Sequence, residues 1–429
     1  MRQAVTAYRR VPCRTLFQPP CPQHRSALYR TRSTTRTLEH IVAQYRYCIG
    51  PRSPSTLCPT CCRGDAYAIK LVFDEKWTNE SSTIRGKRMQ ATHWEALRNY
   101  ESYELIKRDY HERHGRTPST AHAREISAPF AHARSYFMSA RNADQTVKPL
   151  LLYYGVLSLS RGLTLALSRG RREATLAAAH GLSTLQWQNA LSADSPDFGA
   201  LRVAVNQSGS FSELGRATEF CSLLRANSSA INHKLENSAV TPEAEYSLGD
   251  IISRIPALRD HYKRWQGESA CAQFSVEAAE NPTEVIFNVK KAAYLPHVTR
   301  EFCDELFLRS GCSFASESAD NFTYRGTNDI DQNPGVTDFV GHFTIGDVWL
   351  TARYPAGENL SNILTVFTLA YTLGMLVRYF PTQWTALVRS QINDAALPSI
   401  VATIDWIETE YPRLVLGFLV EHKRVTPPR

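Results

Sequence analysis

Apolar residues recur at helical spacing in two long runs that lie far apart in the chain. The first run covers residues 149–167 and the second covers 363–379, and both are apolar on nearly every face. A helix of this kind cannot face water along its length. We therefore expect two buried helices that pack on each other and join the two ends of the folded part into one core.

The helical period also marks the residues before the first run. Residues 94–110 and 119–140 carry apolar stripes at helical spacing. Gly115 is expected to end the first of these helices, and Ser119 or the next residue to cap the second. Pro129 predicts a kink or a boundary inside the second helix.

Prolines and caps divide the remaining helices. Asp144 is a plausible cap for the helix over 149–167. From residue 360 onward the pattern is helical again, and we expect it to be broken at Pro381, Pro398 and Pro412.

Strand patterns gather in the middle of the chain. Alternation over 201–205 predicts a strand, and residues 246–265 predict a helix bent at Pro256. A β-rich part follows, with a helix at about 296–309 and expected strands at 273–277, 285–289, 339–345 and 348–352. Gly346-Asp347 predicts a two-residue hairpin turn between the last two strands.

These elements predict an α+β fold that is mainly α-helical, with N- and C-terminal helical blocks packed into one core and a β-rich insertion. The expected division of the chain is a leader (1–88), an N-terminal helical block (89–225), a linker (226–245), a mixed β-rich segment (246–357) and a C-terminal helical block (358–429).

The basic charge lies in the leader. Residues 1–65 contain eleven arginines, no lysine and two acids, which is a net charge of +9. The whole chain has a net charge of +8, so the remaining residues have a net charge of −1. A neutral body does not support nucleic acid as a partner, although a local basic patch stays open. The leader shows no apolar period and is expected to be disordered. It fits best as an extension of the reading frame upstream of a start at Met89, with organelle targeting or a genuine tail as alternatives.

The positions of cysteines and of apolar residues predict the cellular compartment and whether a metal or a membrane is involved. Cys58, Cys61 and Cys62 lack a second ligand pair at zinc spacing, so no metal or cofactor is expected. Cysteines after the leader are scattered singly, as in a reducing, cytoplasmic compartment. The apolar run 363–377 is shorter than the ~20 residues of a spanning helix, so no membrane segment is expected.

Five short motifs carry a resemblance to a known family. They are Leu97-Arg-Asn-Tyr-Glu-Ser-Tyr103, Pro149-Leu-Leu-Leu-Tyr-Tyr-Gly155 with Leu159-Ser-Arg161, His180-Gly-Leu182, Ser253-Arg-Ile-Pro256 and Arg378-Tyr-Phe-Pro-x-x-Trp384. In this order they resemble the YaaC-like proteins, a bacterial family, from about Trp94 to Leu419. The resemblance implies a shared fold and no particular reaction.

Catalytic spacings are absent or weak. The chain contains no phosphate-binding Gly-rich loop, no nucleophile elbow and no dinucleotide fingerprint. Helical ribonucleases of the HEPN class carry an arginine followed four to six residues later by a histidine. In this chain Arg108 and His114 have this spacing and lie at the end of a well-predicted helix. Such pairs are no more frequent here than chance predicts. Asp329-Ile-Asp331 is expected to be a solvated turn rather than a cation site.

Charged and polar residues beside the apolar runs are the ligand-binding candidates. They are Tyr154, Arg161, His180, Arg353 and Arg378. A lone arginine in an apolar helix needs solvent, an acid or a ligand. Ion pairs to Glu101, Glu104 or Glu358 are one explanation, and a shared pocket for a small anionic ligand is the other.

We therefore expect a binding or interaction protein, with a small anionic ligand or a protein as partner. The alternative is a HEPN-like helical ribonuclease or another nucleic-acid-processing defence protein.

Overall fold

The computed structural model describes residues 93–421, with short gaps inside that range. The gaps are 193–195, 219, 222–234, 237–240, 280, 282–283, 292–295, 297, 309–310, 328–339, 345–346 and 356–359. The leader, most of the expected linker and the Asp329-Ile-Asp331 motif therefore lie outside the described residues.

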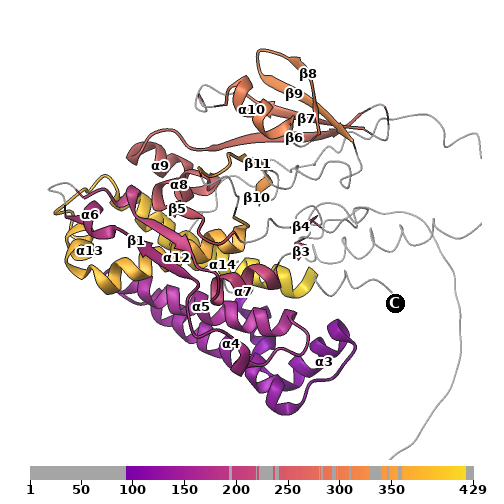
Figure 1. Ribbon diagram of the computed structural model, residues 1–429, viewed down its shortest axis with the longest axis vertical. Helices are drawn as coiled ribbons and strands as arrows, with labels where there is room; N and C mark the ends of the chain where they lie inside the picture. Colours follow the sequence, from indigo (N-terminus) through magenta and orange to yellow (C-terminus); the bar gives the residue numbers. More distant parts are fainter. Residues whose placement is uncertain are drawn as a thin grey trace, which may run out of the picture. The chain divides into compact units, whose positions relative to one another are not determined.

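Helices form both ends of the described chain (Figure 1). At the N-terminal end these are η2 (Arg98–Glu101), α3 (Tyr103–His114), α4 (Thr120–Arg141) and α5 (Lys148–Leu167). At the C-terminal end they are α12 (Asn362–Tyr379), α13 (Pro381–Val388) and α14 (Leu397–Glu421). The expected stop and cap between the first two long helices are confirmed, because Gly115 is left-handed with φ 66° and the Ser119 side chain accepts from His122 N.

Helix α5 lies at the centre of these helices and contacts α4, α12 and α14. Tyr153, Val156, Leu159 and Leu163 on it are fully buried, in the same core cluster as Leu376 of α12. Two helices that are apolar on nearly every side bury that surface against each other, as the sequence predicted. The predicted fold class, with both helical blocks in one core, is confirmed.

Polar contacts fix α14 against the start and middle of α5. The Lys148 ammonium lies 2.9 Å from a carboxylate oxygen of Asp405 and 2.9 Å from one of Glu408. Further along, the hydroxyls of Ser160 and Tyr411 are 2.5 Å apart inside the core. These pairs give the helix packing a defined register, since each buried polar group needs its partner.

A small sheet covers part of the helical core. Strands β1 (Leu182–Leu185), β2 (Arg202–Val205) and β5 (Glu245–Ser247) form an antiparallel sheet in the order β1-β2-β5. The other elements in this part of the chain are short: η3 (Glu173–Thr175), α6 (Trp187–Leu191), η4 (Phe198–Ala200), α7 (Ser210–Ala217), β3 (Phe220–Cys221), β4 (Leu235–Glu236), α8 (Leu248–Ser253), η6 (Pro256–Leu258) and α9 (Arg259–Trp265). The sheet buries Leu182 and Val203 in the helical core.

The β-rich insertion forms a second core. Its six antiparallel strands run in the order β10-β11-β6-β7-β9-β8, and α10 (Arg300–Phe307) packs on them. The strands are β6 (Cys271–Ala278), β7 (Glu284–Lys290), β8 (Ser313–Glu317), β9 (Asn321–Thr327), β10 (Val340–Thr344) and β11 (Asp347–Thr351). The Phe307 ring stacks on Tyr324 with ring centroids 4.5 Å apart. The predicted hairpin is present, but Asp347 pairs with Thr344 and so belongs to the strand rather than to the turn.

The boundary expected at Pro129 and the break expected at Pro412 are wrong. Helix α4 continues through Pro129, and α14 continues through Pro412. Each proline removes one backbone hydrogen bond, at a cost of about 3 kcal/mol in a helix interior, and burial of the flanking apolar side chains outweighs that cost. Asp144 does not cap α5, because its carboxylate accepts from the Thr146 amide and hydroxyl instead. Pro256 starts a separate 3-10 turn, so the helix expected over 246–265 is divided.

Helix α5 is long and apolar enough to cross a membrane by length and composition alone. Helices α12 and α13 would pass the same test only as one span bent by 106°. In α5, 67 % of the apolar window is buried inside the protein. Packing against neighbouring helices therefore accounts for its composition.

Replacing Leu376 by alanine is expected to lower the free energy of unfolding by about 2–5 kcal/mol, the usual range for a buried leucine. Leu376 is fully buried in the seam between α12 and its neighbours. Leu157→Ala is a matched control. Leu157 is only half-buried, so its replacement should lower the free energy of unfolding by less. Urea unfolding of both variants measures the two free energies. Equal losses of stability in the two variants would contradict the packing.

Candidate functional site

Helices α5 and α12 approach each other closely at Gly374. A Cβ atom there would lie 2.7 Å from the Cβ of Tyr153, which is closer than real side chains come. Only glycine permits this approach without displacing one of the helices. The crossing places the next turn of α12, which carries Arg378, beside Tyr154 of α5.

The loop before β1 holds His180 against the same two helices. Gly181 has φ 87°, a left-handed conformation that favours glycine. The carbonyls of Ala179 and His180 accept hydrogen bonds from the amides of Ser210 (2.9 Å) and Phe211 (3.0 Å). The main chain on both sides of the imidazole is therefore fixed.

A short hydrogen bond joins the loop to α5. The Tyr153 hydroxyl lies 2.5 Å from Nδ1 of His180. Burial raises the pKa of Tyr153, so its hydroxyl keeps its proton and donates. Burial, and then the Arg378 charge, lowers the pKa of His180, which favours the neutral ring that accepts this bond at Nδ1. The Tyr371 ring lies beside both groups, with its centroid 5.9 Å from that of His180 and 5.6 Å from that of Tyr153, and its hydroxyl donates to the Leu182 carbonyl.

Arg378 forms the exposed edge of this cluster. Its Nη1 lies 3.4 Å from the Tyr154 hydroxyl, and its guanidinium lies 5.1 Å from the centroid of Tyr379. The Tyr154 ring in turn stacks on Tyr136 at 5.7 Å. Within the part of the chain that the structure describes, no carboxylate lies within ion-pair distance of Arg378. An arginine held by aromatic groups keeps its fork of donors available to an anion.

The structure thus brings together Tyr154, His180 and Arg378. Arg161 lies two turns further along α5 and donates from Nη1 to the Ala177 carbonyl at 3.2 Å, in the loop that leads to His180. Arg353 follows β11, the last strand of the β-rich insertion, where its backbone carbonyl accepts a hydrogen bond from the Arg254 side chain at 2.6 Å.

The acids expected to pair with Arg161 and Arg378 are used elsewhere or not described. Glu101 binds Arg134, with Nε and Oε1 2.5 Å apart, and Glu104 pairs with Lys107 at 3.1 Å. Glu358 lies outside the described residues.

Sequence reasoning missed Tyr153 and Tyr371, which hold the imidazole. A signal was present for both. Tyr153 directly precedes the candidate Tyr154, and Tyr371 stands seven residues, or two helical turns, before Arg378 on the same face of α12.

The pair proposed for ribonuclease chemistry lies on α3. Arg108 is exposed, whereas the half-buried His114 donates from Nε2 to the Ala166 carbonyl at 2.9 Å. The His114 ring packs on Tyr110 with centroids 4.2 Å apart. Burial lowers the pKa of His114, and the charges of Arg113 and other neighbours lower it further.

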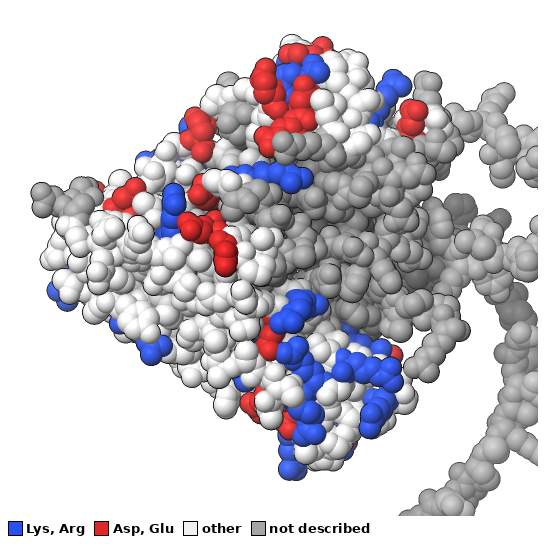
Figure 2. Space-filling model, viewed as in Figure 1, with Lys and Arg blue, Asp and Glu red and all other residues white. Residues whose placement is uncertain are grey.

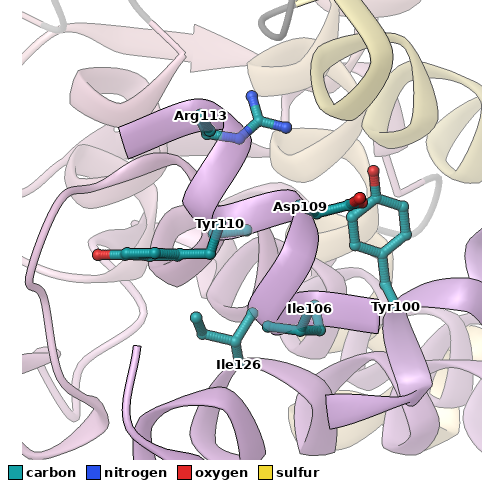
Figure 3. A pocket seen from close by; sticks show the side chains of 7 residues that line it. Tyr100, Ile106, Asp109, Tyr110, Arg113 and Ile126 are labelled. Atoms are coloured by element: carbon teal, nitrogen blue, oxygen red, sulfur yellow. The ribbon is translucent and has the colours of Figure 1, made fainter. Parts of the chain in front are cut away.

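A small buried pocket lies on the inner side of α3 (Figure 3). In it Asp109 points at the Tyr100 hydroxyl and accepts a hydrogen bond from it. Arg113 points away from them and donates to the Leu419 carbonyl at 2.7 Å, which ties α3 to α14. The cavity volume of about 10 Å³ is at the lower limit for one water molecule, so this cluster is structural.

Metal ligands do not converge in the described part of the chain. No three histidine, cysteine or acidic side chains among its residues are placed to hold an ion.

Comparison with known proteins gives one match. The family model described as "YaaC-like Protein" matches residues 94–419, about three quarters of the chain. This range contains all five motifs and every residue of the Tyr153–His180–Arg378 cluster. Neither a curated protein nor a solved structure matches the chain significantly.

Stability is expected to fall as the pH drops below about 6.5, and His180 should contribute to that loss. The imidazole titrates near 6.5 when unfolded and lower when folded, so the unfolded state binds more protons between these values. The contribution is complete above pH 6.5 and disappears as the pH falls through the folded pKa. Urea unfolding at pH 7.5 and 5.5 measures it.

The matched variant is His180→Gln, whose amide oxygen can still accept from Tyr153. It should lose less stability between the two pH values than the wild type does. His93, His114 and His122 also have a lowered pKa from burial, so they supply the loss that remains in the variant. An identical pH dependence in variant and wild type would show that His180 titrates normally.

Proposed function

The chain belongs to the YaaC-like family, and from that premise we propose that it is a binding protein whose site takes a small anionic ligand. The observation that carries the proposal is Arg378. It is exposed, it has no carboxylate partner among the described residues, and it stands beside Tyr154 and the His180 loop. An uncompensated guanidinium at the edge of an aromatic cluster attracts a carboxylate or phosphate group.

The chemistry of the neighbours favours binding over catalysis. Nδ1 of His180 is occupied by the Tyr153 hydroxyl, so that nitrogen is not free to accept a substrate proton. The Tyr154 hydroxyl can donate to or accept from a ligand bound at Arg378. Tyr379, with 59 % of its surface exposed, offers an apolar face next to the cation. A ligand with an anionic group and a flat or apolar portion fits these donors best.

The open position of Arg378 also suits an acidic group presented by a protein partner. A small ligand is the leading candidate because the aromatic rings around it, including Tyr136 and Tyr154, provide a compact rather than an extended surface. A protein partner would need a standard interface of about 1,600 Å² around the same arginine.

We propose a cytoplasmic setting in a bacterium. Three cysteines in the described residues, Cys271, Cys303 and Cys312, are buried and form no disulfide. Burial raises the pKa of Cys271 to about 11 and that of Cys303 to about 12, so both stay protonated and inert. Free thiols that need no disulfide partner suit a reducing compartment.

Replacing Arg378 by alanine should weaken ligand binding strongly while leaving the fold intact. A panel of small carboxylates and phosphate esters, tested one by one for a rise in Tm, identifies a binder. A charge-assisted contact is worth about 1.5–3 kcal/mol, so Kd should rise about 10- to 150-fold in Arg378→Ala. Arg378→Lys should recover part of the loss.

The matched control is Arg389→Ala, which removes another exposed arginine a short distance along the chain. It should bind the ligand like the wild type. A ligand that binds Arg378→Ala normally would remove the basis of the proposal.

The alternative function, a helical ribonuclease using Arg108 and His114, predicts a different result. We expect purified protein to leave RNA intact, because Nε2 of His114 already donates to Ala166. Incubation with labelled RNA checks this. Cleavage that disappears in both Arg108→Ala and His114→Gln, at unchanged Tm, would support the ribonuclease instead.

A further inference from the structure

The surface over α3 and the adjoining helix ends is basic. Figure 2 shows lysine and arginine side chains gathered there, with few acids between them. We call it the α3 basic surface and define it by Lys107, Arg116, Arg124, Arg169 and Arg172. These residues come from α3, the turn after it, α4 and the segment that follows α5.

Part of this charge is compensated and part is not. Lys107 pairs with Glu104, and Arg172 binds Glu125 with Nε and Oε2 2.8 Å apart. Arg116, Arg124 and Arg169 are exposed and have no carboxylate within ion-pair distance among the residues that the structure describes. Three like charges without counter-ions attract a polyanion and repel one another until it binds.

An exposed aromatic ring lies within this surface. Tyr103 has 36 % of its surface exposed. The Lys107 ammonium and the Arg124 guanidinium each lie 5.3 Å from its ring centroid. A ring flanked by cations can stack a base while the cations contact the adjacent phosphates, which is how single strands are held without sequence preference.

Contacts around Tyr110 keep the surface in place. His114 and His122 pack on the Tyr110 ring, with centroids 4.2 and 5.2 Å away. The Tyr110 hydroxyl accepts from the Gly170 amide at 2.6 Å, which fixes the segment after α5 to α3. The arginines on these elements are therefore presented on a fixed frame, and little order needs to form on binding.

We propose that the α3 basic surface binds single-stranded nucleic acid, with phosphates on Arg116, Arg124 and Arg169 and a base on Tyr103. A membrane fits less well, because the other large exposed apolar side chains in the described residues, such as Met138 and Val147, lie outside the defined surface. The proposal shares no residue with the Arg378 site, so each can fail without the other.

The test compares two full-length triple variants with equal charge change. One is Arg116→Glu with Arg124→Glu and Arg169→Glu. The control changes three exposed cations elsewhere, Arg264, Lys290 and Arg389, to glutamate. The arginine-rich leader is present in both, so its own attraction for nucleic acid cancels in the comparison.

Binding of a fluorescent 20-nucleotide RNA is measured by anisotropy over a range of salt concentrations. Each phosphate contact to a single strand contributes about 0.7 to the slope of log K against log salt, so three lost contacts flatten it by about 2. With equal binding of variant and wild type at 1 M salt, this slope change corresponds to about 500-fold weaker binding of the α3 variant at 50 mM salt. The control variant should stay close to the wild type.

The tyrosine gives a second readout. Tyr103→Ala should weaken binding about fivefold or more, from the loss of about 1 kcal/mol or more of stacking, with an unchanged salt slope. Tyr103→Phe should bind normally. Circular dichroism melting checks folding, and glutamine variants at the same three arginines replace any glutamate variant that does not fold.

Binding of other polyanions is measured in the same way for comparison. Single-stranded DNA should bind like RNA, whereas duplex DNA and vesicles containing phosphatidylserine should bind more weakly. Equal weakening in the α3 and control variants, or stronger binding of vesicles than of single strands, would overturn the proposal.

Discussion

Burial of α5 is the interaction on which the rest of the structure depends. Its side chains are apolar on nearly every face, and α4, α12 and α14 cover them from different sides. A leucine-rich helix of this length would expose a large apolar surface if any of these neighbours were removed. Since α4 and α12 are separated by more than 200 residues, the core can close only when both ends of the described chain are present.

The same packing positions the candidate ligand site. Tyr153 fits against Gly374 at the helix crossing, and its hydroxyl reaches the imidazole of His180. The side chains that hold the site are thus core residues, whereas Arg378 is the exposed end of the arrangement. Any change in the crossing of α5 and α12 would move the histidine loop and the arginine together, so the geometry of the site follows from the packing of the core.

The sequence allowed the fold class and the central helices to be predicted because their signal is long and periodic. The all-round apolar character of residues 149–167 and 363–379 requires that both helices be shielded from water, and in the structure they are buried against each other. A helix boundary at Pro129 and a break at Pro412 were wrong, because the energy of tertiary packing is not visible in a local rule. Strand β8 was missed, since its residues are mostly exposed and carry no alternation of apolar and polar positions.

For the site, Tyr154, His180 and Arg378 could be selected by their position beside apolar helices. The convergence of these three residues could not be predicted. It depends on the contact of Gly374 with Tyr153 and on a loop that backbone hydrogen bonds hold in place. Charge shows the same limit. Residues after the leader are nearly neutral in total, yet acids such as Glu408 and Glu101 are consumed by Lys148 and Arg134 in other parts of the helical core. Neutrality of a sequence therefore does not imply neutrality of each surface, and Arg116, Arg124 and Arg169 have no carboxylate partner among the described residues.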